Sequence, residues 1–178
     1  MSDIFHYGFT VWLTGLPCSG KSTLAKRLAS ELLKLRVNVR VLDASEIRAT
    51  LNRDLGFSKE DRFENIRRVR YLCKLLNKLR IVVVAAFVSP YREMREDLRS
   101  EIPNYVEVYV KCPVNLCSQR DGLGLYQKAF SGETANFTGV SAPYEEPLKP
   151  DVICKTDSLT PEQSVAKILA KLKELKLI

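Results

Sequence analysis

Nine residues near the start of the chain have the composition of a phosphate cradle. Residues 15–23 read G-L-P-C-S-G-K-S-T and match the pattern G-x-x-x-x-G-K-[ST]. Glycines let backbone N–H groups converge on phosphate oxygens, the lysine adds a movable positive charge, and the serine hydroxyl can ligate Mg²⁺. The motif predicts a P-loop that binds a nucleoside triphosphate such as ATP. The residues expected to hold it are Gly15, Ser19, Gly20, Lys21, Ser22 and Thr23.

The P-loop alone leaves the class of protein open, because motors, switches, transporters and small kinases share it. Cys18 lies inside the loop. We interpret it as a small residue; the alternative is an oxidisable thiol that would block phosphate binding.

Asp43 is the second candidate for chemistry. It ends the apolar run 38–43 and is followed by A-S-E-I-R. Ligands of open α/β sheets bind at the carboxyl ends of the strands, so Asp43 is placed to act on Mg²⁺ or on an acceptor hydroxyl. An equally good interpretation is that Asp43 or Ser45 caps a helix beginning at Glu46.

Residues 54–68, D-L-G-F-S-K-E-D-R-F-E-N-I-R-R, are dense in charge. Arg62 and Asn65 are three apart and share one face of a predicted helix. A guanidinium can fork onto a phosphate or sulfate, an amide can donate and accept, and Phe57 offers a stacking surface. From the residues alone, a solvated helix face is favoured over an anion-binding surface.

The same stretch begins a helix over residues 59–79. Ser58 followed by Asp61 resembles a capping box. Apolar residues then recur at steps of three and four, which predicts a buried stripe. Its members are Phe63, Ile66, Val69, Leu72, Leu76 and Leu79.

Apolar segments of strand length alternate with amphipathic helical segments along the chain. Strands are expected at 8–14, 38–43, 80–88, 105–111 and 151–154. Helices are expected at 21–35, 59–79, 91–100 and 161–176, the last capped by Thr160 with Pro161 at its first position. This alternation predicts a single α/β domain, residues 1–178, with a parallel sheet, right-handed crossovers and helices on both faces.

Residues 120–150 break the alternation. They contain four of the eight glycines and three of the eight prolines, with little apolar periodicity. A long interval without regular structure inside a domain is usually functional, so a mobile lid is expected here.

The composition is that of a soluble globular protein: 178 residues, 46% hydrophobic, 28% charged and net charge +7. The basic residues are scattered, which favours small anionic ligands over nucleic acid. Five cysteines without a C-x-x-C pair are expected to be reduced thiols in the cytoplasm. A polar start without a long apolar run argues against secretion or a membrane span, and His6 is expected to be incidental.

Further segments carry a resemblance to a known family. With the P-loop and residues 54–68 they run in the same order as in adenylylsulfate kinases, from about residue 8 to the end of the chain. They are F-V-S-P-Y-R (87–92), E-V-Y-V (107–110), R-D-G-L-G-L-Y (120–126), F-T-G-V-S-A-P-Y-E (137–145) and P-D (150–151). The resemblance implies a P-loop kinase fold and transfer of the γ-phosphoryl group of ATP, with Mg²⁺, to the 3′-hydroxyl of adenosine 5′-phosphosulfate. The products would be 3′-phosphoadenosine 5′-phosphosulfate and ADP.

The resemblance also implies roles for individual residues. Phe57 and Phe137 correspond to a pair that sandwiches the acceptor's adenine. Arg120 lies where the family's lid begins over the donor nucleotide, and members often form homodimers. Lys21 and Asp43 are the expected catalytic residues. Asp43 is also grouped with the expected acceptor-binding residues, which are Arg48, Phe57, Arg62, Asn65, Ser89 and Phe137.

The chain departs from the family's pattern at two places. The family reads D-G-D-N after the second strand, whereas residues 43–46 read D-A-S-E, so Ser45 replaces an acid and Glu46 is a candidate substitute. In the lid, Leu123 replaces a lysine, and Phe130 and Ala135 replace basic residues, leaving Lys128. The family's reaction is favoured. The alternatives are a P-loop kinase of another small hydroxyl acceptor or a catalytically weakened nucleotide-binding protein.

Overall fold

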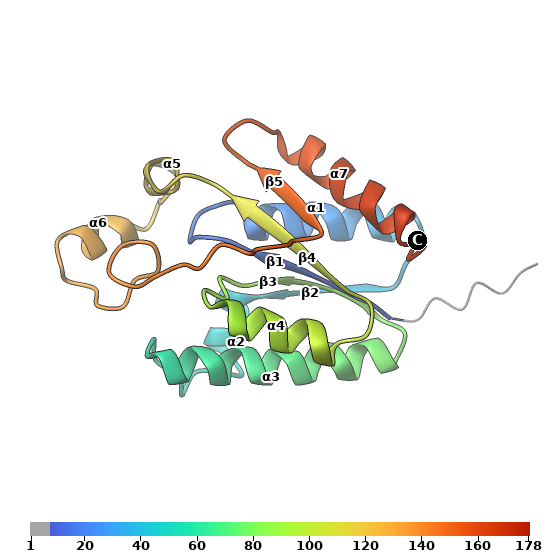
Figure 1. Cartoon of the computed structure of the whole chain (residues 1–178), viewed down its shortest axis with the longest axis horizontal. Helices are drawn as coiled ribbons and strands as arrows, with labels where there is room; N and C mark the ends of the chain where they lie inside the picture. Colours follow the sequence, from blue (N-terminus) through green and yellow to red (C-terminus); the bar gives the residue numbers. More distant parts are fainter. Residues whose placement is uncertain (1–7) are drawn as a thin grey trace, which may run out of the picture.

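The five apolar segments form one parallel sheet in the computed structural model, which describes residues 8–178 (Figure 1). The spatial order is β2-β3-β1-β4-β5. β1 and β3 lie inside the sheet and are buried along their whole length, which explains their nearly continuous apolar sequences. His6 lies outside the described residues. The strands are β1 (Thr10–Thr14), β2 (Val39–Asp43), β3 (Val82–Ala86), β4 (Tyr105–Lys111) and β5 (Val152–Lys155).

Helices cover both faces of this sheet (Figure 1). One layer contains α1 (Lys21–Lys34) and α7 (Pro161–Glu174); the other contains α3 (Lys59–Lys78) and α4 (Arg92–Glu101). Three short helices lie at the carboxyl ends of the strands: α2 (Ala44–Ala49), α5 (Val114–Gln119) and α6 (Leu125–Phe130). The predicted α/β architecture is confirmed. None of the helices in residues 8–178 is long and apolar enough to cross a membrane.

The strand order places a ligand site beside β1. The chain moves from β1 to β2 at one edge of the sheet, returns through β3, and then continues to β4 and β5 on the other side of β1. In such sheets the crevice lies outside the carboxyl ends of the strands, where the order reverses. The segment that follows β1, and therefore the P-loop, lies at this point.

The helix caps follow the sequence signals. The Ser58 hydroxyl accepts from the backbone N–H of Asp61 at 3.0 Å, and Thr160 forms a complete capping box with Gln163. Asp43 caps α2 by accepting from the backbone N–H of Ser45, so the capping interpretation of Asp43 is confirmed. The helix begins at Ala44, however, two residues before the predicted start.

Two predictions about helices are wrong. Residues 120–150 are not wholly irregular, because α6 forms within them around a buried Tyr126. Leu79 is exposed, since α3 ends at Lys78, and the inward face of α3 continues instead through Cys73 and Asn77. The Asn77 side chain hydrogen-bonds Thr10 of β1, a polar contact that an apolar periodicity cannot reveal.

Candidate active site

The P-loop connects the end of β1 to the start of α1, as its sequence requires. A side chain at Gly15 would place its Cβ 2.4 Å from the carbonyl oxygen of Val110 in the neighbouring strand. Gly20 adopts a φ of 103° and is the N-cap of α1, where no side chain bonds the first turn. The N–H groups of that turn are therefore available to an anion, and the helix dipole adds to the attraction.

Lys21 is buried within the loop. Its Nζ donates to the carbonyl oxygen of Leu16 at 2.6 Å and lies 3.5 Å from the Ser19 hydroxyl. Burial lowers the pKa of Lys21 to about 8, because the charged ammonium loses hydration. An anion in the cradle would favour the charged form again.

Ser22 and Asp43 place two oxygen ligands together beside the P-loop. The Ser22 hydroxyl donates to Oδ2 of Asp43 at 2.5 Å, while Oδ1 of Asp43 accepts from Ser45. Asp43 therefore caps α2 and also lies beside the cradle through its contact with Ser22. Residues 8–178 contain no cluster of three acidic, histidine or cysteine side chains suited to a metal. A divalent cation at this point would need oxygens from the ligand and from water as well.

A cavity of about 330 Å³ opens beside the P-loop, and Arg120 forms part of its wall. The Arg120 guanidinium donates to the hydroxyl and the carbonyl oxygen of Thr156 at 3.1 and 2.7 Å. Thr156 in turn donates to the carbonyl oxygen of Ser19. These bonds connect Arg120 to the P-loop through Thr156. Thr156 was missed, although it directly follows β5, the same kind of position that singled out Asp43.

Cys18 also lines this cavity. Its pKa is raised, chiefly by burial and further by the charge of Asp121. A thiol with a raised pKa is a poor nucleophile, which supports its interpretation as a small residue.

Two arginines without acidic partners lie against Phe57. The guanidinium carbons of Arg48 and Arg62 are 4.3 and 5.6 Å from the centroid of its ring. Within residues 8–178 neither arginine forms an ion pair, although Arg48 donates to the carbonyl oxygen of Gly56 at 3.0 Å. Burial lowers the pKa of both arginines, and the charge of Asp61 partly offsets this effect at Arg48. The Phe57 ring itself is 55% exposed. Buried positive charge is costly unless it is paired, so this pair of arginines is suited to an anionic ligand.

Arg62 also connects the segment around Phe57 to the predicted lid, residues 120–150. Its Nε donates to the carbonyl oxygen of Phe57 at 3.1 Å, and its Nη2 donates to the carbonyl oxygen of Asn136 at 2.5 Å. Phe137, the next residue in the lid, packs edge-on against Tyr126 with ring centroids 4.9 Å apart. Arg62 therefore joins the segments that carry Phe57 and Phe137. Within residues 8–178 the two rings do not stack on each other.

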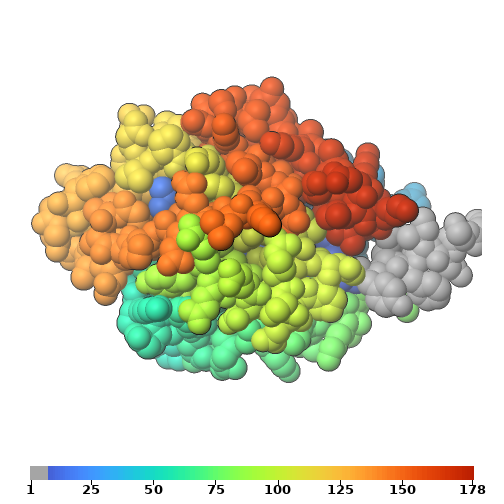
Figure 2. Space-filling model, viewed as in Figure 1, coloured from blue at the N-terminus to red at the C-terminus, as the bar shows by residue number. Residues whose placement is uncertain are grey.

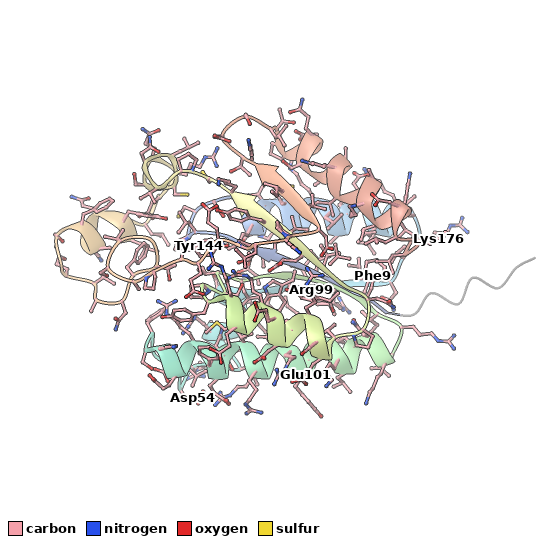
Figure 3. The ribbon with its side chains drawn as sticks, in the orientation of Figure 1. Phe9, Asp54, Arg99, Glu101, Tyr144 and Lys176 are labelled. Atoms are coloured by element: carbon pink, nitrogen blue, oxygen red, sulfur yellow. The ribbon has the colours of Figure 1, made fainter. Side chains whose placement is uncertain are left out.

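Ser89 lies beneath the site rather than in its wall. Its buried hydroxyl accepts from the Trp12 indole at 3.0 Å and donates to the Thr14 hydroxyl at 3.0 Å. Thr14 donates to the carbonyl oxygen of Val88, so the Tyr144 hydroxyl must donate to Thr14, at 2.9 Å. Tyr144 comes from the segment that returns from the lid, near the carboxyl ends of the strands (Figure 3). The Ser89 hydroxyl is thus committed to fixing this segment against β1.

The lid is attached to the P-loop at its start and to α4 at its end. The Tyr126 hydroxyl donates to the carbonyl oxygen of Pro17 at 3.0 Å. At the other end, the Glu145 carboxylate accepts from the first N–H of α4, that of Arg92, at 2.8 Å. Leu123, the departure from the family's pattern, is 79% exposed on the lid.

A second hollow, of about 690 Å³, lies between β4 and residues 139–146 of the lid. Figure 2 shows it as a depression between the yellow and orange segments, with blue atoms from the P-loop region at its base. Leu16 is the P-loop residue that lines it. Although this hollow is larger, the 330 Å³ cavity contains Gly20, Thr23 and Arg120 and is therefore the one suited to the donor nucleotide.

Comparisons with known proteins agree with this geometry. A family profile described as Adenylylsulphate kinase matches residues 7–155. The chain is 48% identical to the adenylyl-sulfate kinase of Microcystis aeruginosa over 168 residues, which cover 94% of this chain and 93% of that protein. It is 49% identical over 168 residues to a probable bifunctional SAT/APS kinase 2 of Sorangium cellulosum, of which it spans only 29%. The structure of the Mycobacterium tuberculosis APS kinase CysC with AMPPNP and APS matches with a TM-score of 0.90 and 36% identity, covering 94% of this chain and 98% of that one.

Proposed function

The chain belongs to the adenylylsulphate kinase family, and on that premise we propose how its cleft performs the reaction. ATP binds in the P-loop, and adenosine 5′-phosphosulfate binds against the beginning of α3. The γ-phosphoryl group passes to the 3′-hydroxyl of the acceptor and leaves ADP and 3′-phosphoadenosine 5′-phosphosulfate. The observation that carries this proposal is the pair of unpaired guanidiniums, Arg48 and Arg62, beside the exposed ring of Phe57.

The two sides of the cleft bind different substrates: one side binds the phosphoryl donor and the other binds the acceptor. On the donor side, the N–H groups of the loop and Lys21 hold the triphosphate, and Arg120 borders the cavity suited to the nucleoside. On the acceptor side, Arg62 and Arg48 bind the phosphosulfate, and Phe57 and Phe137 hold the adenine. Phosphoryl transfer depends on positioning and on stabilising charge, so these groups supply most of what the reaction needs. The lid excludes water that would otherwise hydrolyse ATP.

Ser22 and Asp43 fit a magnesium ion. A hydroxyl and a carboxylate 2.5 Å apart beside the cradle are the hard oxygen ligands that Mg²⁺ prefers, and it usually takes one or two such ligands plus phosphates and water. When bound, Mg²⁺ neutralises charge on the phosphates. Asp43 holds its position through the backbone N–H of Ser45, a contact that does not require an acid at position 45.

Replacing Asp43 is expected to weaken the use of Mg²⁺. In Asp43→Asn, the Mg²⁺ concentration for half-maximal turnover should rise about tenfold, because a charged ligand is lost. The measurement is a Mg²⁺ titration at saturating ATP and acceptor. Glu46→Gln, three residues further along, is the matched control and should behave like the unsubstituted chain. The opposite pattern would assign the metal to Glu46.

Nucleotide binding is expected to depend on pH through Lys21. Its pKa is about 8 in the free protein, and a triphosphate beside it raises that pKa. Binding therefore takes up a proton above pH 8, and affinity should fall by up to about tenfold per pH unit there, with no contribution from this group at lower pH. The test is the Kd of a non-hydrolysable ATP analogue between pH 7 and 9.5. The Lys21→Met variant should lack this dependence; an unchanged pH profile in that variant would contradict the assignment.

We also propose that residues 1–178 act as one catalytic domain in the cytoplasm, with 120–150 as its lid. Free thiols at all five cysteines support a reducing compartment. A homodimer is supported by three exposed side chains at four-residue spacing, Tyr71 and Leu75 on α3 and Leu79 directly after its last residue. Light scattering after size-exclusion chromatography measures the mass; a monomer at micromolar concentration would exclude the dimer.

The acceptor is tested by a coupled assay of ADP release. Adenosine 5′-phosphosulfate is compared with AMP, simple sugars and other small alcohols at equal concentration. We expect turnover with the phosphosulfate only, because among these compounds it alone presents an adenine together with a phosphosulfate to the acceptor side of the cleft. Turnover with another alcohol alone would favour a different kinase. Tight binding of both substrates without ADP release would favour a weakened nucleotide-binding protein.

A further inference from the structure

The side-chain amide of Asn65 has a donor end and an acceptor end, and only the donor end can bind an anion. Its Oδ1 accepts from Nδ2 of Asn52 at 2.8 Å. Within residues 8–178 no group accepts a hydrogen bond from Nδ2 of Asn65. Asn52 and Asn65 are 1% and 6% exposed, so water competes little for these groups. The contact with Asn52 therefore decides which end of Asn65 is available.

The orientation of Asn52 is decided in turn by Arg68. Nη1 of Arg68 donates to Oδ1 of Asn52 at 3.4 Å and also to the carbonyl oxygen of Leu51 at 3.3 Å. A guanidinium has donors but no acceptor, so Asn52 must turn its oxygen toward Arg68 and its NH₂ group toward Asn65. Arg68 is held in place by a double contact with Asp54, at 2.7 Å to each oxygen, and by Glu64 at 2.8 Å. Asp54 lies at the beginning of α3 in Figure 3.

We propose that Arg68 and Asn52 form an amide relay that fixes Asn65 with its NH₂ group toward the anion of the acceptor. The inference rests on the proposed function, which places that anion against the beginning of α3. Asn52 and Arg68 are positioning residues, because they act through Asn65 and not on the substrate. The relay starts at the Arg68 guanidinium, which can only donate hydrogen bonds, and ends at the Asn65 NH₂ group, which must donate to the anion.

Two substitutions at Asn52 separate this function from ordinary packing. In Asn52→Asp, the carboxylate keeps the contact with Arg68 but must accept from Asn65, which turns the Asn65 oxygen toward the anion. In Asn52→Leu, the restraint disappears and Asn65 can adopt either orientation. The KM for adenosine 5′-phosphosulfate should rise about a hundredfold in Asn52→Asp and about tenfold or less in Asn52→Leu, with the KM for ATP within about twofold of its original value.

The thermal stability of the two Asn52 variants distinguishes the relay from a merely structural role of Asn52. Asn52→Asp retains a charged partner for Arg68, whereas Asn52→Leu leaves polar groups unpaired, so Asn52→Leu should have the lower Tm. The relay therefore predicts that the more stable variant binds the acceptor less well. A merely structural role predicts the reverse, with the acceptor KM rising in step with the loss of Tm, and that result would overturn the relay.

Arg68 gives a second test on a side chain that is only partly buried. Arg68→Met removes the donor and should raise the acceptor KM severalfold, and Arg68→Lys, which keeps a donor, should restore most of it. Arg67→Met is the matched control, because Arg67 also contacts Glu64 but has no bond to Asn52. Equal acceptor KM values for Arg68→Met and Arg67→Met would overturn the relay even if the Asn52 variants did not fold.

Asn65→Asp distinguishes the relay from the proposed function on which it rests. A carboxylate facing an anion should raise the acceptor KM by a hundredfold or more. If Asn65→Asp has no effect, Asn65 does not face the acceptor, and both the site assignment and the relay fail. If it has this effect while Asn52→Asp is no worse than Asn52→Leu, the relay alone fails.

Discussion

Lys21→Ala is expected to lower kcat by about 10³-fold or more, because removing a group that stabilises transferring phosphoryl charge costs at least this much in related sites. The side chain is buried in the P-loop and donates to the Leu16 carbonyl oxygen, so it is already positioned where the phosphates bind. The measurement is single-turnover formation of ADP at saturating ATP and acceptor, which separates chemistry from product release.

Lys26→Ala, on the exposed face of the same helix, is the control and should leave kcat unchanged. The Tm of Lys21→Ala should not fall, since burying an ammonium is costly and its removal relieves that cost. A Lys21→Ala variant that retains more than a tenth of the turnover would show that Lys21 does not stabilise the transferring phosphoryl group.

Arg62→Ala is also expected to have a large effect, on use of the acceptor. It should lower kcat/KM for adenosine 5′-phosphosulfate by about a hundredfold and leave the KM for ATP unchanged, because charge-assisted hydrogen bonds contribute about 1.5–3 kcal/mol each. Arg62 also holds the carbonyl oxygens of Phe57 and Asn136, so its loss releases both segments expected to hold the adenine. Initial rates across a grid of ATP and acceptor concentrations give both constants.

Two further variants make this test more specific. Lys74→Ala removes another positive charge from α3, one that pairs with Glu101 on α4 and should not affect acceptor use. Arg62→Lys keeps the charge but has all its donors on one nitrogen, so it cannot span the two carbonyl oxygens and an anion as a guanidinium can, and it should recover only part of the loss. Normal acceptor kinetics in Arg62→Ala would refute the placement of the acceptor against α3.

The sheet and the P-loop could be predicted because their signals are local. Central parallel strands are apolar throughout, and G-x-x-x-x-G-K-[ST] has one conformation between a strand and a helix. The short helices α5 and α6 could not be predicted in the same way, since six residues contain less than two turns of periodicity, and α2 was anticipated only from its capping residue Asp43. Tyr126 is buried through contacts with other parts of the chain: it packs against Cys117 and Phe137, and its hydroxyl reaches Pro17, more than a hundred residues away.

In the site, too, the sequence indicates which residue types could bind a ligand but not which hydrogen-bond partners the fold gives them. The sequence could nominate Arg62, since a guanidinium suits an anion, but its bond to Asn136 spans 74 positions and depends on the folded lid. Ser89 was nominated as a substrate contact, whereas its hydroxyl is committed to Trp12 and Thr14. Asn52 and Thr156 were overlooked because an amide or hydroxyl outside a motif has no distinguishing pattern; only their hydrogen bonds reveal their positions.

The departures from the family's pattern affect different parts of the site. Ser45 occupies the first turn of α2, where its backbone N–H supports Asp43, so the carboxylate beside Ser22 is retained. Leu123 and Phe130 lie exposed on the lid, and the centroid of the Phe130 ring lies 6.1 Å from that of Tyr126, whose hydroxyl attaches the lid to the P-loop. Their effect should therefore concern closure of the lid more than the assembly of the phosphate cradle.

The most direct test of the account is to identify where the phosphoryl group goes. The protein is incubated with Mg²⁺, adenosine 5′-phosphosulfate and ATP labelled at the γ-phosphate, and the products are separated and identified by mass spectrometry. We predict that the label appears in 3′-phosphoadenosine 5′-phosphosulfate in an amount equal to the ADP formed. Label recovered as inorganic phosphate, with the phosphosulfate unchanged, would contradict the account.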